Sequence, residues 1–284
     1  MKATNDHNVL SSMFLWVDHF LADKGTAYSN IESNFYHYTD VRITDKVIYG
    51  SPFKQFIYDD SVSGSIPVTI SGDGQLIPKG TSGMKVDYGE GRVIFDSTVS
   101  TGIALSGSYS VKDFNIYTTN QNEEEIVVEG KYKNNSRRTR TLSNVTPYDI
   151  ATPAIFLSLE GGGNEAFAFG GEDETMTQLK AVILAEDIFH LDGALSIFKD
   201  SRELCVSNIP FTGSPLGEYG DIKSGAYPTG FNYNDIAANY NTDNYQLDSV
   251  TTSKLSDEVR KEIPSNLFVG FVDFEIKQYR FPRV

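Results

Sequence analysis

The sequence is poor in thiols, which excludes a disulfide framework. It contains a single cysteine, Cys205, so no disulfide can form within the chain. Cys205 stands between Leu204 and Val206, a context that predicts a small buried hydrophobic side chain. A catalytic thiol requires a histidine partner, and none lies near it in the sequence.

Histidines are also few. The four are His7, His19, His37 and His190. They are scattered, and with one cysteine beside them they do not support a zinc site. His19 and His190 fall within predicted helices, and we expect both at the surface or at the rim of the core.

Positive charge is in deficit. The chain has 24 Lys and Arg against 38 Asp and Glu, a formal net charge of −14. This balance argues against a phosphate-binding surface, because nucleic-acid affinity comes mostly from Lys and Arg. One basic run, Arg137-Arg138-Thr139-Arg140, follows the acidic run Glu123-Glu124-Glu125. On paired strands the two runs would compensate each other, and we interpret the basic run as a solvated edge or loop.

Long apolar runs are missing. The most apolar early stretch, residues 9–21, contains Asp18 and His19 and is too short to cross a bilayer. It lacks the basic leader and the small-residue cleavage site of a signal peptide. We therefore expect synthesis in the cytosol and no membrane contact.

Motifs for phosphate binding and nucleophilic catalysis are missing too. No phosphate-binding loop occurs, and Gly161-Gly162-Gly163 leads into another apolar stretch, so it predicts a turn rather than a dinucleotide site. Residues 80–83 lack the spacing of a nucleophile elbow.

Acidic residues suggest no convergent site. Asp59 and Asp60 are adjacent, and neighbouring carboxylates on a strand point to opposite faces, which does not suit glycoside hydrolysis. A calcium site in irregular loops stays open, for example at Asp221, Asp235 and Asp243. We assign no catalytic, cofactor-binding or metal-binding residue, and we predict that the protein is not an enzyme.

Aromatic residues are plentiful. The chain has 18 Phe and 16 Tyr, and 39% of it is hydrophobic, so a packed core is expected. A tyrosine ring with its polar tip suits protein interfaces, and it also suits an ordinary half-buried strand. Both interpretations stay open.

The pattern of apolar residues predicts an α+β fold that begins with a helix. Apolar residues at spacings of three and four predict a helix at residues 8–24, capped by Asn5 or Asp6 and ended by Gly25 in a left-handed conformation. We interpret the polar, Tyr-rich segment that follows as a connecting segment. The helix and this segment together form a first unit, residues 1–45, which we expect to pack with the C-terminal domain.

Short strand signals separated by turns follow. They include residues 53–58, a turn at residues 71–74, a hairpin at residues 86–95 and alternating stretches at residues 114–118 and 126–132. This pattern predicts a β-sandwich-like module at residues 46–148.

The third unit, residues 149–284, predicts a small mixed sheet with a central helix. Residues 154–159 and 176–185 predict strands, and Asp187 can cap a helix whose stripe is Ile188, Leu191, Leu195 and Phe198. Residues 207–250 predict a long functional loop or an arm over a neighbouring subunit. The apolar stretch 267–276 predicts a final buried strand.

Two pieces of this pattern resemble tail terminator and neck proteins of long-tailed bacteriophages. They are the opening helix at residues 8–24 and the block at residues 153–202, with residues 267–276 as the closing strand. The Tyr- and Gly-rich style of residues 86–95 is similar to modules of phage virion proteins. The inserted module and the 207–250 loop depart from a minimal terminator.

The resemblance implies a virion structural protein, assembled in the host cytoplasm, that forms a hexameric ring at the head–tail junction. Its partners would be other copies of itself and other tail or neck proteins, with DNA only as passing cargo. The alternatives are a baseplate, tail fibre or capsid decoration protein, and a carbohydrate-binding or carbohydrate-active protein. We further predict that acidic residues line the passage of the ring, with residues 267–276 and 207–250 crossing between subunits.

Overall fold

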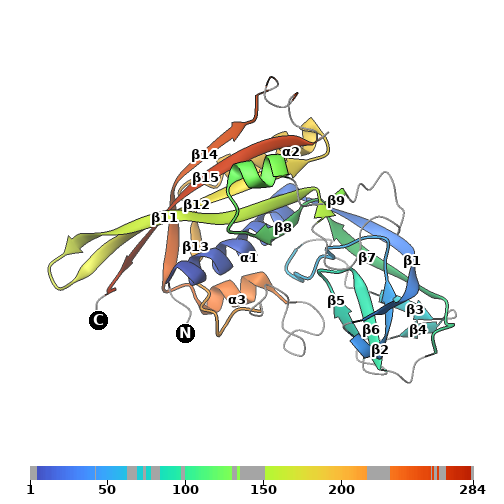
Figure 1. The fold of residues 1–284 in the computed structure, drawn as a ribbon. Helices are drawn as coiled ribbons and strands as arrows, with labels where there is room; N and C mark the ends of the chain where they lie inside the picture. The colour runs from blue at the N-terminus through green and yellow to red at the C-terminus, as the bar shows by residue number, and fades with distance from the viewer. Residues whose placement is uncertain are drawn as a thin grey trace.

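The fold is α+β, as predicted, with two β-sheets and helices packed beside them (Figure 1). The computed structural model describes residues 5–41, 43–62, 69–72, 75–77, 84–96, 100–129, 133–134, 151–215, 231–256, 258, 261 and 267–282.

The first element is helix α1, Asn5–Gly25. Its apolar residues recur every three or four positions, so Met13, Trp16, Val17 and Phe20 share one buried side. The helix is buried over most of its circumference, as its wide apolar stripe predicts. The residue in the left-handed conformation after the helix is Thr26, with a φ of 48°, and not Gly25 as predicted.

A seven-stranded antiparallel sheet follows. Its order is β4-β3-β7-β1-β2-β6-β5. The strands are β1 (Tyr28–Asp40), β2 (Ile43–Gly50), β3 (Thr69–Gly72), β4 (Gln75–Ile77), β5 (Lys85–Asp87), β6 (Arg92–Asp96) and β7 (Leu105–Lys112). The predicted tight hairpin is confirmed in β5 and β6. Of the turn predicted at residues 71–74, residues 71–72 belong to β3, which pairs with β4, and residues 73–74 lie outside the described residues.

The segment after α1 corrects one prediction. Residues 28–40 are a strand inside this sheet rather than a connection, because Tyr28–Phe35 of β1 pair with β7 and Tyr36–Asp40 pair with β2. Phe35 is the one apolar side chain of β1 that is buried. The alternation of apolar and polar residues that predicts a strand is therefore weak in this segment. The seven-stranded sheet therefore spans residues 28–112, where the predicted module spanned residues 46–148.

The second sheet has six strands in the order β13-β14-β15-β12-β11-β8. They are β8 (Asn115–Thr118), β11 (Ala154–Ala168), β12 (Glu172–Ala185), β13 (Cys205–Ser207), β14 (Asn244–Lys254) and β15 (Phe268–Arg280). β8 pairs parallel with β11, and the other pairs are antiparallel. The apolar strands predicted at residues 176–185 and 267–276 are confirmed at the centre, as β12 and β15.

Shorter elements complete the described fold. They are the π-helical turn η2 (Glu125–Glu129), the parallel pair β9 (Lys133–Asn134) and β10 (Ala151–Thr152), and helices α2 (Ile188–Lys199) and α3 (Tyr233–Asn239). The cap of α2 is as predicted: the side chain of Asp187 accepts a hydrogen bond from the backbone N–H of His190. Leu191, Leu195 and Phe198 are buried, as their stripe predicts, whereas Ile188 is exposed.

Four local predictions were wrong. Residues 125–129 form η2 instead of a strand, and the predicted strand at residues 53–58 is irregular chain with one bridge, from Phe56 to Val111. Gly161–Gly163 do not form a turn, because β11 continues through them along β12. Residues 207–250 are not one long loop, because they contain α3 and the start of β14; residues 216–230 lie outside the described residues.

One large hydrophobic core joins the two sheets and the helices. It contains side chains of α1, both sheets and α2. Trp16 stacks on Phe20 with ring centroids 4.7 Å apart and meets the edge of Phe274 of β15 at 6.3 Å. A second, smaller cluster lies on the opposite face of the six-stranded sheet, where Ile126 and Val127 of η2 cover Phe156 and Val182.

Candidate functional site

The two faces of the six-stranded sheet differ in chemistry. Alternate residues of β12 and β15, such as Ala181, Ile183, Val272 and Phe274, are buried in the core with α1 and α2. The intervening residues lie on the other face, which is polar beyond the part that η2 covers. Solvent therefore reaches this face, whereas the helices bury the opposite one.

Carboxylates dominate the exposed face. Cross-strand pairs place Lys180 opposite Asp273, Glu174 opposite both Glu165 and Tyr279, and Gln178 opposite Glu275. We call this surface the acidic face; its charged residues are Glu123, Glu160, Glu165, Glu174, Lys180, Asp248, Asp273, Glu275 and Lys277.

Both lysines of the acidic face are held by carboxylates. The Lys180 ammonium lies 2.5 Å from Glu123 and 3.6 Å from Asp273, and the hydrogen bond with Glu123 raises the pKa of Lys180. The Lys277 ammonium lies 3.2 Å from Asp248 and 3.3 Å from Glu174, and these hydrogen bonds raise its pKa. The face keeps a net negative charge, since its carboxylates outnumber its ammonium groups.

The far halves of β11 and β12 project from the body as a hairpin arm, with the end of β15 beside them (Figure 1). Residues 160–170 are all exposed. Aromatic side chains gather at the end of this arm, where Phe167, Phe169, Tyr279 and Phe281 have exposed fractions of 59%, 110%, 44% and 52%. Exposed large apolar side chains on one projection are typical of a protein-binding surface.

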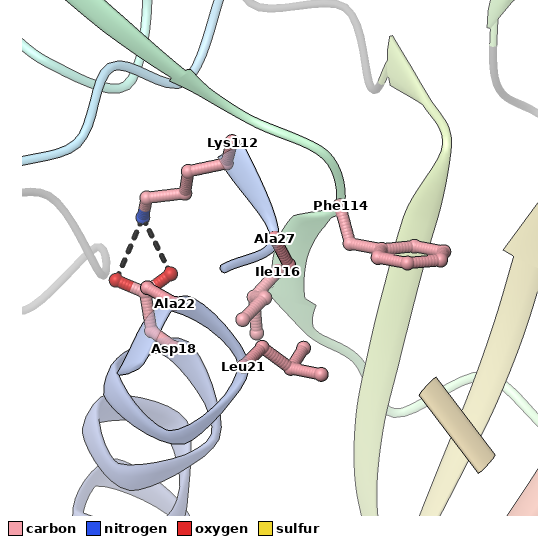
Figure 2. A pocket seen from close by; sticks show the side chains of 7 residues that line it. All are labelled: Asp18, Leu21, Ala22, Ala27, Lys112, Phe114 and Ile116. Atoms are coloured by element: carbon pink, nitrogen blue, oxygen red, sulfur yellow. Dashed lines mark hydrogen bonds and ion pairs between the residues drawn. The ribbon is translucent and has the colours of Figure 1, made fainter. Parts of the chain in front are cut away.

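A buried ion pair lies where α1 meets the two sheets. Figure 2 shows the Lys112 ammonium pointing at both oxygens of Asp18, at 2.7 and 2.8 Å. The same ammonium lies 3.9 Å from the centre of the Tyr58 ring. Burial lowers the pKa of Lys112, although Asp18 opposes this effect. The adjoining cavity has a volume of about 10 Å³, room for about one water molecule, which is far below the roughly 300 Å³ of small-molecule sites.

A second polar cluster lies nearby on α1. The Nδ1 atom of His19 is 2.7 Å from Asp59, which also accepts hydrogen bonds from Ser61 Oγ at 2.6 Å and the Tyr233 N–H at 3.0 Å. Burial would raise the pKa of Asp59, but the hydrogen bonds from His19, Ser61 and Tyr233 outweigh it and lower that pKa.

This second cluster has the residue types of a nucleophile relay but not its geometry. Ser61 Oγ and Asp59 both lie at the same nitrogen of His19, the serine at 3.4 Å, whereas a relay places them at opposite nitrogens. Ser61 instead bonds Asp59 directly. The arrangement joins α1 to residues 59–61 and 233, which is a structural role.

Several residues of the sequence analysis can now be placed. His19 was expected at the surface or at the rim of the core, and it lies at the rim, where its side chain is 11% exposed beside Asp59 and Tyr233. His190 is exposed and pairs with Asp187, as expected of a surface residue. Cys205 is exposed instead of buried, because in the short strand β13 it is Val206 that points to the core.

The remaining histidines lie apart from these clusters, whereas the acidic candidate Asp59 belongs to the second polar cluster. His7 and His37 are exposed, with ring contacts to Phe211 and Tyr49. Asp59 is buried whereas Asp60 is exposed.

The calcium candidates have ordinary surroundings where they are described. Asp235 is in the first turn of α3, and Asp243 accepts hydrogen bonds from Asn208 and Gln278. Asp221 and residues 137–140 lie outside the described residues. Elsewhere in the described chain, His, Cys, Asp and Glu do not gather in the groups of three that a metal ion would need.

Comparisons with known proteins identify no relative: no protein-family model matches the chain, and no curated protein is significantly similar to it. Among the helices that the structure describes, none is long and apolar enough to cross a membrane.

Proposed function

We propose that this chain is a ring-forming structural subunit of a tailed-phage virion. The ring lies at the neck or the end of the tail, where it joins head and tail, and the acidic face lines its passage. The observation that carries the proposal is the asymmetry of the six-stranded sheet, which is buried under helices on one face and exposed and acidic on the other. The place in the virion rests on the resemblance of the helix and strand pattern to tail terminator and neck proteins.

An acidic lining suits a passage for DNA. Each Lys or Arg that contacts a phosphate releases counterions and adds affinity, so a basic wall would retain the DNA. On the acidic face the two lysines are already paired with carboxylates, which leaves them poorly placed to bind phosphate. DNA would therefore slide past without being held.

A ring also needs a contact that repeats from one copy to the next. The sequence suggested β15 and residues 207–250 for this contact. β15 cannot supply it, because its hydrogen bonds join β12 on one side and β14 on the other. Of residues 207–250, the start of β14 pairs with β13 and β15 in its own chain. The projecting arm is the better candidate.

The arm also supports the first alternative function. In a baseplate, tail fibre or capsid decoration protein, the exposed aromatics of the arm would bind a different protein. A carbohydrate-binding role has less support, because the pocket beside Asp18 and Lys112 is too small for a sugar chain.

Electron microscopy of the purified protein tests the proposal. Closed rings with a central passage are expected. Elongated or single particles would favour the first alternative function, and glycan binding by a monomer would favour the carbohydrate role. A passage lined by Arg137, Arg138 and Arg140, or subunits seated on the outside of the capsid, would overturn the proposal.

A charge reversal then tests the lining. Asp273→Lys/Glu275→Lys should leave ring formation intact and add DNA binding that weakens as salt rises. The matched control is Glu32→Lys/Asp45→Lys, which changes the net charge equally on exposed positions of the other sheet. If both variants bind DNA equally in a filter-binding assay, the acidic face does not line the passage.

A further inference from the structure

At each border of the six-stranded sheet, the outermost described strand is shorter than the strand beside it. On one border, β8 pairs with β11 at Ala154–Leu157. Beyond that point, among the described residues, no strand pairs with the outer edge of β11 along the arm, residues 159–168. On the other border, the short strand β13 ends the described sheet, beside the start of β14.

The open edge of β11 and the strand β13 lie at the same position along the strand direction, on opposite borders of the sheet. Following the cross-strand pairs, Cys205 is opposite Gln246, which is opposite Lys277, then Met176, and finally Gly163. A second copy placed beside the first without a shift along the strands would therefore bring its β13 to the middle of the open arm edge. Four antiparallel steps separate the two strands, so β13 and β11 run in the same direction.

We propose that the open edge of β11, residues 159–168, binds β13 of a second copy of this chain, with Gly163 near Cys205. The two edges differ, so each copy offers one of each and the contact repeats from copy to copy. This contact would join neighbouring subunits of the ring, so the inference rests on the proposed function.

The composition of the two edges supports strand addition. Natural sheets protect exposed edges with charged side chains, proline or bulges. Residues 161–164 and 205–207 carry none of these, whereas Glu160, Glu165 and the two register shifts of β11 lie on either side of residues 161–164. Gly161, Gly162 and Gly163 leave the outer edge of β11 without bulky side chains, so another backbone can approach it closely. Phe167 and Phe169, exposed at the end of the same arm, would gain an apolar partner from the neighbouring copy.

Cys205 provides the test, because it is the only cysteine and it is exposed. Gly163→Cys places a second thiol on the same face of the sheet. A Cβ at Gly163 meets nothing within 4 Å, so the fold accommodates it. Residues on neighbouring strands lie about 5 Å apart, within the roughly 7 Å between Cα atoms that a disulfide spans.

Mild oxidation of the Gly163→Cys protein, with a short bismaleimide in parallel, should give a ladder of covalent dimers, trimers and larger species on a non-reducing gel. The native protein can give dimers at most, because each copy has one thiol. Three controls should give no ladder: Gly163→Cys/Cys205→Ser, Asn164→Cys on the opposite face of the same strand, and Lys199→Cys on α2.

The outcomes separate this contact from the proposed function. Rings in the microscope without a ladder would overturn the strand contact and leave the proposed ring standing. A ladder from open filaments would support the contact and overturn the closed ring. A protein that stays monomeric, with no ladder, would overturn both.

Discussion

Replacing Lys112 by methionine tests whether the buried ion pair holds α1 in place. The side chains of Lys112 and Asp18 are 4% and 6% exposed, so the change leaves a carboxylate buried without its cation. Removing one partner of such a pair lowers the free energy of unfolding by about 3–5 kcal/mol. At about 2–4 °C per kcal/mol for a chain of this size class, the melting temperature should fall by roughly 6–20 °C.

The double variant Asp18→Leu/Lys112→Met removes both charges and should recover most of this loss, since an apolar pair of similar volume is often as stable as the ion pair. Urea unfolding followed by tryptophan fluorescence is a direct assay, because the single tryptophan, Trp16, is buried on the same helix. The matched control is Lys46→Met, which removes an exposed partner of Asp96 and should leave the unfolding curve unchanged. A Lys112→Met protein as stable as the native one would refute the reasoning.

Two further predictions concern stability. The pKa of Asp59 is lowered in the folded protein, so its carboxylate stabilises the fold above about pH 4 and this contribution is lost as pH falls through the lowered pKa. Asp59→Asn should therefore be less stable at neutral pH and lose less stability between about pH 4 and 2, as measured by urea midpoints across that range; parallel curves would contradict this. Gly91→Ala should destabilise by at least about 1–2 kcal/mol, because Gly91 has a φ of 64° and a Cβ there would lie 1.9 Å from the carbonyl oxygen of Phe53. Gly163→Ala, where the Cβ is unobstructed, is its control, and equal urea midpoints for the two variants would contradict the strain argument.

The elements that the sequence predicts well are those whose pattern is local and strong. Helix α2 carries its own cap in Asp187 and its own stripe in Leu191, Leu195 and Phe198. The central strands β12 and β15 are apolar nearly throughout one half, as strands buried on both faces must be. In each case, a few neighbouring residues are sufficient to specify the element.

The elements that were missed depend on distant partners. β1 is polar and becomes a strand because β7, far along the chain, pairs with Tyr28–Phe35. Gly161–Gly163 favour a turn locally, but the ladder with β12 holds them extended. The acidic face could not be found from the sequence either, because it forms only when the register of β11, β12 and β15 brings separate carboxylates together.

The pairing of His19 with Asp59 was missed for the same reason. The residues are 40 positions apart, and neither has a distinctive sequence context. Cys205 is different: its exposure follows from simple alternation in a short strand whose middle residue, Val206, is buried. Weighing period-two alternation above the apolar neighbours of Cys205 would have predicted it.

The order of the strands has a consequence for synthesis. β15 is made after β12 and β14, yet it lies between them and supplies hydrogen bonds to both. Until β15 leaves the ribosome, the edges of β12 and β14 that it later covers lack their native partner. Such edges are prone to pair with other chains, so the growing polypeptide is most vulnerable to aggregation just before this strand emerges.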